Sequence, residues 1–333
     1  LYDYPIVEAI RSILPLCDEV VVAVGESEDG TLEMIRELSQ RAPLTPKGGP
    51  PPAPYNAPPA PKGEHPPSSH KSTNPHLENA AGGSPPLGVR GAQGSEQSKI
   101  KILQTKWNPN LRKGGKVLAE ETNKAFRAIS KDSDWAFYIQ GDEVIHEKYL
   151  PTIREAMERY KNDPKIDGLL FNYLHFYGSY DFVGDSYTWY RKEVRIVRND
   201  PKIYSYRDAQ GFRKGNNQKL KVKPVDAYVH HYGWVKPPKA QQRKQRTFQK
   251  LWHPDNLVQQ KVPNVAEYDY SQIDSLKKFE GTHPEIMKDR IARQDWHFDY
   301  DLCQNRLRKK DRFKRMIENW TGWRIGEYKN YKL

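Results

Sequence analysis

Short apolar runs of strand length alternate along this chain with segments whose apolar residues recur at helical spacing. Val20–Val24 is an uninterrupted buried-strand pattern, whereas the apolar residues from Ile6 to Leu14 keep one helical face. Strands separated by helices favour an α/β fold with a mostly parallel sheet and helices on both faces. The strands expected are 19–24, 100–105, 135–140, 168–177, 191–198 and 227–231, and the helices are 6–14, 30–38, 115–129 and 150–160.

Residues 43–98 interrupt this alternation. They hold 14 of the 26 prolines and 8 of the 22 glycines, with very few aliphatic residues. Proline removes backbone donors and glycine raises the entropic cost of ordering, so the segment is predicted to be a disordered insertion. It divides the chain into 1–42, the insertion 43–98, 99–235 as the rest of one domain, and 236–333 as a basic helical extension without further strands.

Charge and cysteine content narrow the classes of partner and compartment. The formal net charge of +12 permits nucleic acid, a nucleotide or an anionic membrane as partner, and it does not choose among them. Cys17 and Cys303 are too few for a disulfide scaffold and suit a reducing compartment, so a cytoplasmic location is expected. No apolar run approaches the length of about 20 residues that a membrane-spanning helix needs.

The strongest chemical signal lies at the end of one expected strand. The run from Trp135 to Gln140 is followed by Gly141 and by two adjacent carboxylates, Asp142 and Glu143. In α/β sheets, ligands bind beyond the carboxyl ends of strands, and carboxylate oxygens there can hold a hard divalent cation beside a phosphate. Taken alone, the loop is explained better as an acidic turn that caps the next helix.

The order of the motifs along the chain favours the cation site over the acidic turn. Tyr4-Pro5, the strand 20–24, the segment 26–31, Gln140-Gly141-Asp142-Glu143 and His231-Tyr232-Gly233 occur in the order and at the spacing of a known family. Together they resemble the bacterial family-2 glycosyltransferases, which have the Rossmann-like GT-A fold. The resemblance implies an inverting hexosyltransferase that moves a sugar from a nucleotide-sugar donor to a glycan or lipid-linked acceptor in cell-surface polysaccharide biosynthesis.

The resemblance also implies a set of metal ligands. Asp142 matches the last acid of the family's Asp-x-Asp motif and would bind Mn²⁺ or Mg²⁺ at the donor diphosphate, with Glu143 in support. Gln140 stands where the family has the first acid. His231 of the closing motif is a further candidate ligand, although a hydrogen-bonded structural histidine explains it equally well.

The nucleotide side of the expected site comes from two loops. Glu26, Ser27 and Asp29 match the family's nucleotide loop, in which Gly25 and Glu26 replace two consecutive aspartates; Asp29 is also explained as a helix cap. Arg112 and Lys116 flank a glycine pair at a helix start, where cations and free N–H groups suit diphosphate oxygens, and a solvated loop is the equal alternative. The family's first strand is expected to lie upstream of Leu1.

An inverting transfer needs a carboxylate that removes the proton of the acceptor hydroxyl. By its position in the family pattern, Asp208 is the candidate base. Asp185 and Glu193 are the alternatives.

Two other functions are compatible with the chain. A nucleotidyltransferase on a similar sheet would need a glycine-rich basic loop after its first strand. A basic nucleic-acid-binding protein would explain the charge, but Lys and Arg are scattered and no nucleic-acid-binding motif occurs, so no nucleic-acid partner is expected.

The C-terminal segment 305–333 carries ten Lys or Arg against three acids. Leu307, Phe313, Met316, Ile317 and Trp320 keep helical spacing, and basic residues flank them. Such a helix can lie peripherally on an anionic membrane, here the inner face of the plasma membrane. Alternatively, it packs its apolar stripe on the catalytic domain and leaves its charges in water.

Overall fold

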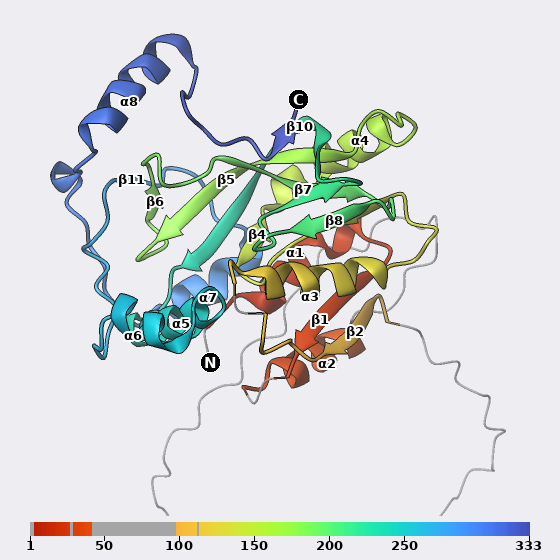
Figure 1. The fold of residues 1–333 in the computed structure, drawn as a ribbon, viewed down its shortest axis with the longest axis horizontal. Helices are drawn as coiled ribbons and strands as arrows, with labels where there is room; N and C mark the ends of the chain where they lie inside the picture. The colour runs from red at the N-terminus through yellow and green to blue at the C-terminus, as the bar shows by residue number, and fades with distance from the viewer. Residues whose placement is uncertain (1–2, 27–28, 42–97, 112) are drawn as a thin grey trace, which may run out of the picture.

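The computed structural model describes residues 3–26, 29–41, 98–111 and 113–333 (Figure 1). The predictions made for 43–97, Ser27 and Arg112 fall outside the described residues. The helices are α1 (Ile6–Ile13), α2 (Thr31–Gln40), α3 (Lys116–Arg127), α4 (Leu150–Tyr160), α5 (Pro238–Lys250), α6 (Asp255–Lys261), α7 (Lys288–Ala292) and α8 (Lys309–Thr321), with short 3₁₀ turns at Leu14–Leu16, Glu147–Tyr149, Glu285–Met287 and Leu302–Gln304.

A small parallel unit forms the N-terminal part of the fold. Strand β1 (Val20–Gly25) leads into α2, and the chain returns in β2 (Ile100–Thr105), which pairs with β1 in parallel from Val20–Ile100 to Gly25–Thr105. Ile35 of α2 is fully buried against these strands. All three elements were expected from the apolar periodicity, and the structure confirms them.

The other strands belong to one large mixed sheet. They are β3 (Trp135–Phe137), β4 (Glu143–Ile145), β5 (Gly168–Tyr177), β6 (Phe182–Gly184), β7 (Lys192–Arg198), β8 (Ile203–Tyr206), β9 (Gly211–Lys214), β10 (Gln218–Trp234), β11 (Leu276–Lys278) and β12 (Tyr331–Lys332). Its longest contact is the parallel pairing of β5 with β10.

The expected α/β class is confirmed, but the expectation of a mostly parallel sheet is wrong. Among the described strands, β1–β2, β5–β10 and β10–β12 are parallel pairs, and the other seven pairs are antiparallel. The antiparallel strands are mostly short. For example, β8 and β9 form a hairpin whose turn holds Arg207 and Ala209 at positive φ. Residues other than glycine rarely adopt this conformation, so the sequence of this segment does not predict a turn.

Helices cover both faces of the large sheet. Leu169 and Phe171 of β5 point into one core together with Ile13 and Ile153, which belong to α1 and α4. Leu170, between them on the strand, points into a second core, against which Phe126 of α3 packs. Alternate residues of one strand therefore supply two layers of core.

The C-terminal region was expected to be helical without further strands, but it also contains two short strands. Strand β11 pairs with β6, and β12 adds to the large sheet beside β10 through Leu220–Tyr331. These strands have three and two residues, too few to show any alternation in the sequence. Within the described residues, no helix has the length and apolar composition required to cross a membrane.

Strand directions place the expected site. Strand β3 is antiparallel to β7, and β7 is antiparallel to β5, so β3 runs in the same direction as β5 and β10. The chain that follows β3 therefore reaches the same edge of the sheet as the carboxyl ends of β5 and β10. Asp142 lies in the segment that follows β3, and His231 lies near the carboxyl end of β10.

Candidate functional site

Asp142 and His231, both candidate metal ligands through the family resemblance, lie together at this edge. Oδ2 of Asp142 lies 3.5 Å from Nε2 of His231, and both side chains are only 13% exposed. The close approach depends on Gly233, because a Cβ atom there would lie 2.6 Å from Oδ2 of Asp142 and 2.7 Å from Nε2 of His231. The Tyr232 N–H also donates to the Asp142 carbonyl oxygen at 2.8 Å.

A second histidine orients the imidazole of His231. Nε2 of His175 lies 2.8 Å from the carbonyl oxygen of Tyr190, which can only accept, so this nitrogen carries the hydrogen. Burial and the neighbouring His231 hold the pKa of His175 well below its ordinary value, so its Nδ1 is an acceptor. It receives the Nδ1–H of His231 over 3.1 Å. Nε2 of His231 is thereby the nitrogen left to face Asp142.

Two lysines complete the surroundings of Asp142. Nζ of Lys244 on α5 lies 3.8 Å from Oδ2 of Asp142, and the Lys236 ammonium sits 3.8 Å from the centre of the Tyr4 ring. Burial by itself would raise the pKa of Asp142. The neighbouring His231, Lys244 and Lys236 outweigh this effect and hold the pKa well below its ordinary value. Burial and the like charge of Lys244 lower the pKa of Lys236 to about 6. We refer to Asp142, His231, His175, Lys236 and Lys244 as the Asp142 site.

Glu143 points away from the Asp142 site. Its side chain is fully buried and forms a two-pronged ion pair with Arg195, at 2.7 Å from Nη2 to Oε1 and 3.0 Å from Nε to Oε2. The Tyr173 hydroxyl donates to the same carboxylate at 3.0 Å. Both oxygens are therefore engaged within the protein. Within the part of the chain that the structure describes, no group of three or more His, Cys, Asp or Glu side chains is placed to hold a metal ion.

Arg195 connects the Asp142 loop to the predicted base. Besides Glu143, its guanidinium donates to the Gln210 carbonyl oxygen at 2.9 Å, in the turn that carries Asp208. Asp208 itself is half-buried and lies against Gly115 at the start of α3, where an added Cβ atom would come within 2.7 Å of the Asp208 Cβ. The loops of Asp142, Asp208 and the glycine pair thus form one connected region.

The other nucleotide-side residues are placed less centrally. Glu26 is exposed at the end of β1, and the Asp29 carboxylate accepts from the backbone N–H and hydroxyl of Thr31, at 3.2 and 2.6 Å. Asp29 therefore bonds to the start of α2, as expected if it caps the helix rather than binding a nucleotide. Lys116 is exposed and lines a groove of about 720 Å³ between α3 and the β8–β9 hairpin, together with Lys124, Arg127 and Arg207.

The two alternative bases are both bound to other groups. Glu193 is 2% exposed; burial raises its pKa to about 7, and it bonds to the backbone of Val194 and to Asn330. Asp185 forms an ion pair with Arg315 of α8 at 2.8 Å. Neither carboxylate faces the Asp142 site through any contact that the described residues show.

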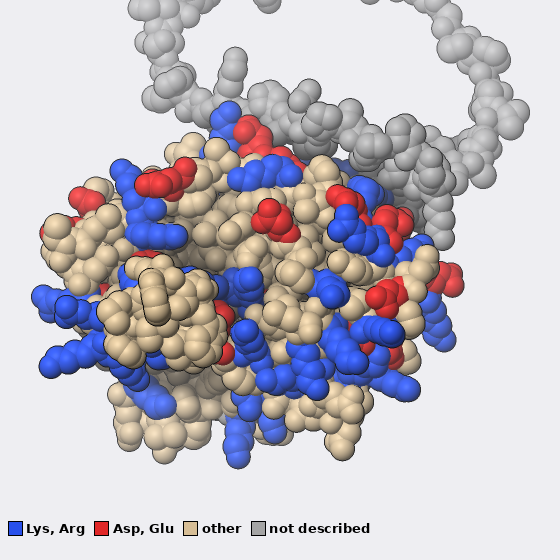
Figure 2. Space-filling view, turned by 90° about the horizontal axis from the view of Figure 1, so that it is seen from above, with Lys and Arg blue, Asp and Glu red and all other residues tan. Residues whose placement is uncertain are grey.

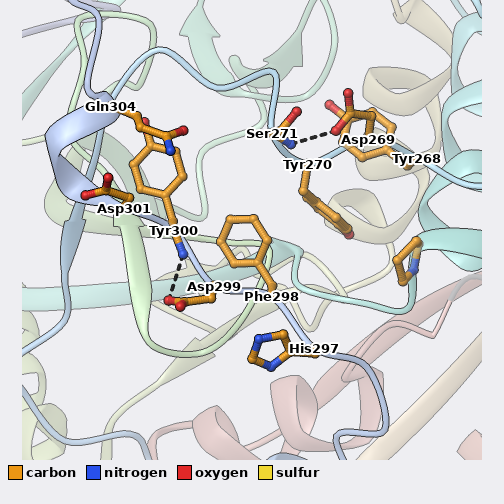
Figure 3. A pocket seen from close by; sticks show the side chains of 11 residues that line it. Tyr268, Asp269, Tyr270, Ser271, His297, Phe298, Asp299, Tyr300, Asp301 and Gln304 are labelled. Carbon is orange, nitrogen blue, oxygen red and sulfur yellow. Dashed lines mark hydrogen bonds between the residues drawn. The ribbon is translucent and has the colours of Figure 1, made fainter.

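A pocket of about 320 Å³ lies between the segments 268–271 and 297–304 (Figure 3). Aromatic rings and carboxylates share its wall: Tyr268, Tyr270, Phe298, Tyr300, Asp269, Asp299 and Asp301. The pocket and the site share one backbone segment. The Tyr270 hydroxyl donates to the Lys236 carbonyl oxygen at 2.9 Å, and the Tyr268 N–H donates to the Pro238 carbonyl oxygen at 3.1 Å.

Four side chains that surround or connect these candidate residues were missed in the sequence analysis. His175, Lys236 and Lys244 carry no local signal, because their role arises only from contacts with Asp142 or His231. Arg195 did carry one, since it interrupts the otherwise apolar run Val194–Val197 of a buried strand and so must have a buried partner.

No protein-family model matches this chain, and no curated protein is significantly similar in sequence.

Proposed function

We propose that the chain is an inverting glycosyltransferase that moves a sugar from a nucleotide-sugar donor to a glycan or lipid-linked acceptor. The observation that carries the proposal is the meeting of Asp142 with His231 at the common end of β3, β5 and β10. Ligand sites of α/β proteins lie at such an edge. The motif order, which resembles family-2 glycosyltransferases, supports the same assignment.

The finer description of the fold belongs to this proposal. The parallel β1–α2–β2 unit and the three co-directional strands of the large sheet are compatible with a GT-A, Rossmann-like domain in which antiparallel strands extend the sheet. In this interpretation the glycine pair at the start of α3, Lys116 and the nucleotide loop approach the donor from one side, and α5 approaches it from the other.

Asp142 and His231 fit a divalent cation, whereas Glu143 does not. The hydrogen bond between the Nδ1 atoms of His175 and His231 leaves Nε2 of His231 facing Oδ2 of Asp142, and a histidine that binds a metal through one nitrogen commonly donates its other N–H to a neighbouring acceptor. These two side chains would hold Mn²⁺ or Mg²⁺, which when bound neutralises charge on the donor diphosphate. Glu143 contributes by fixing Arg195.

The chain's own groups perform the remaining steps. Lys244 lies next to Asp142 and offers a positive charge to the diphosphate as it departs from the anomeric carbon. Asp208 accepts the proton of the acceptor hydroxyl as that oxygen attacks the anomeric carbon. Arg195 is a positioning residue, because it holds the Asp142 and Asp208 loops in one geometry.

The pocket between the segments 268–271 and 297–304 suits the acceptor. Aromatic faces pack against the apolar faces of sugar rings, and carboxylates accept hydrogen bonds from sugar hydroxyls. Tyr270 and Tyr268 belong to the pocket wall and are tied to the segment that carries Lys236. A glycan that occupies the pocket would therefore lie beside the donor site.

The test is release of nucleoside diphosphate from a panel of nucleotide sugars, with Mn²⁺ and a mixture of glycan and lipid-linked acceptors. Asp208→Asn should lower turnover about 10²–10⁴-fold without weakening donor binding. Asp132→Asn, an exposed loop acid, is the matched control and should keep full turnover.

Two results would contradict the proposal. Near-normal turnover of Asp208→Asn together with a loss in Asp185→Asn or Glu193→Gln would place the base elsewhere. No turnover of any nucleotide sugar, with steeply salt-dependent binding of random oligonucleotides, would favour the nucleic-acid alternative.

A further inference from the structure

Helix α8 attaches to the rest of the molecule through its charged side. Glu318 accepts from the Tyr187 hydroxyl at 2.6 Å and pairs with Arg191 at 2.5 Å. Arg315 pairs with Asp185 at 2.8 Å. The inward side of this helix is therefore polar and is held by ion pairs to the loop between β6 and β7.

The opposite side of α8 is apolar and exposed. Phe313 and Met316 are 60% and 59% exposed, and Trp320 is 88% exposed. At 100° per residue, these three positions lie together, roughly 170° around the helix from Asp311, Glu318 and Arg315. Trp323, just past the helix, is 61% exposed as well. We call Phe313, Met316, Trp320 and Trp323 the α8 outer face.

This orientation reverses the usual one. A surface helix normally buries its apolar stripe and leaves its charges in water. The alternative stated from the sequence, that the stripe packs on the catalytic domain, does not describe this structure. A cluster of large apolar side chains held outward by ion pairs on the inward side marks a contact with something outside the chain.

The charges around the α8 outer face indicate what that contact is. Lys309, Lys310 and Arg312 are exposed on and beside it, whereas the acids Asp311 and Glu318 are turned inward into ion pairs. The face of the molecule at the top of Figure 1, where α8 lies, shows more Lys and Arg than Asp and Glu side chains (Figure 2). The outward surface thus combines tryptophans with positive charge.

We propose that the α8 outer face docks the protein on an anionic lipid membrane. Tryptophan rings favour the headgroup region, apolar side chains enter the boundary with the acyl chains, and basic residues are attracted to anionic headgroups. A neutral apolar partner would explain the exposed rings but not the surrounding lysines and arginine. The inference does not depend on the proposed transferase activity.

The experiment is co-sedimentation of the full chain with vesicles of phosphatidylcholine alone and of an equimolar mixture with phosphatidylglycerol. The protein should bind the anionic vesicles, and salt should weaken this binding. The triple variant Phe313→Ser, Met316→Ser, Trp320→Ser should bind at least about tenfold more weakly. Its side chains are exposed, so the fold should survive, as circular dichroism can verify.

Charge reversal gives an independent second variant. Lys309→Glu, Lys310→Glu, Arg312→Glu should lower binding at least about 100-fold. The matched control, Lys131→Glu, Lys165→Glu, Lys277→Glu, changes the net charge by the same amount at exposed lysines outside α8 and should retain most of the binding. Met34→Ser, which removes an exposed apolar side chain on α2, controls for the serine variant.

Three results would overturn the inference. They are equal binding by the α8 variants and their controls, equal binding to neutral and anionic vesicles, and no binding to either. Concentration-dependent self-association that disappears in the serine variant, without vesicle binding, would assign the α8 outer face to a second copy of the chain instead.

Discussion

At the scale of single residues, the adjacent acids Asp142 and Glu143 in the loop 140–143 have different roles. Asp142 turns toward His231, while Glu143 opens β4 and turns into the core toward Arg195. Asp142 lies in the turn closed by the Glu143 N–H and the Gln140 carbonyl oxygen, and Glu143 begins the strand that follows, so the two carboxylates serve different sites. The pairing of Asp142 with His231 was predictable through the family resemblance. The lysines around Asp142 were not, because their positions depend on α5 and on the segment after β10.

The buried ion pair gives the first prediction. Glu143→Gln should lower the free energy of unfolding by about 3 kcal/mol, because it leaves the Arg195 guanidinium buried without its counter-charge. Chemical denaturation measures this change. Glu155→Gln, which breaks an exposed pair with Arg159, should change stability by less than about 1 kcal/mol. If Glu143→Gln instead keeps full stability and loses only Mn²⁺ binding, then Glu143 is a metal ligand after all.

A buried histidine gives the second prediction. His230 is 1% exposed beside the rings of Phe176 and Tyr232, and burial lowers its pKa to about 3. The unfolded chain binds a proton below about pH 6.5 and the folded one does not, so stability present above pH 6.5 is lost as the pH falls toward 3. His230 alone contributes a slope of up to about 1.4 kcal/mol per pH unit.

His230→Phe should remove that contribution to the slope. Denaturation midpoints between pH 7 and pH 4 measure it, and the slope rather than the absolute stability is the relevant quantity. An unchanged slope in the variant would show that His230 is protonated in the folded protein.

At the scale of elements, the predictable part of the fold is the part with long periodic segments. Helices α1 to α4 and strands β1, β2, β5 and β7 follow the apolar patterns closely. Strands β4, β6, β8, β9, β11 and β12 have at most four residues and were missed. Their places are set by partners distant in sequence, and a segment of this length carries too few residues to show a period. The same reason explains why the sheet was expected to be mostly parallel.

The smallest of these strands gives the third prediction. Tyr331 of β12 is 6% exposed in the core beneath β10, and its neighbour Asn330 accepts a hydrogen bond from Arg213 at its carbonyl oxygen over 2.9 Å. Tyr331→Ala should destabilise the protein by about 3 kcal/mol, a typical loss for a buried aromatic residue. Trp323→Ala, at a position 61% exposed, should change the stability by less than about 0.5 kcal/mol. Equal effects would mean that β12 is not docked in solution.

At the scale of the whole molecule, the insertion gives the fourth prediction. The described ends of that segment meet, because the Ser39 hydroxyl donates to the Ser98 hydroxyl oxygen at 2.9 Å, and the Ser98 hydroxyl donates to the Ser39 carbonyl oxygen at 2.6 Å. Ser98, predicted as the last residue of the insertion 43–98, is thus bound to α2, and a short Gly/Ser link in place of residues 43–97 can join α2 to β2 without moving either element.

The free energy of unfolding of this shortened chain should be equal to that of the full chain or higher by up to about 2 kcal/mol, since each halving of loop length lowers the entropic cost of closure by only about 0.6 kcal/mol. Thermal unfolding and nucleotide-sugar turnover, compared between the two proteins, measure the effect. A large loss of stability or turnover would show that the segment packs on the domain or contributes to the site.

The central claim is that the Asp142 site binds a nucleotide diphosphate together with a divalent cation. Isothermal titration calorimetry with UDP, GDP and CDP, each with and without Mn²⁺, tests it most directly on the wild type, Asp142→Asn and the exposed control Asp132→Asn. We predict that at least one nucleotide binds the wild type and the control in a Mn²⁺-dependent manner, and that Asp142→Asn weakens this binding at least about tenfold. Equal affinity of Asp142→Asn and the wild type would contradict the claim.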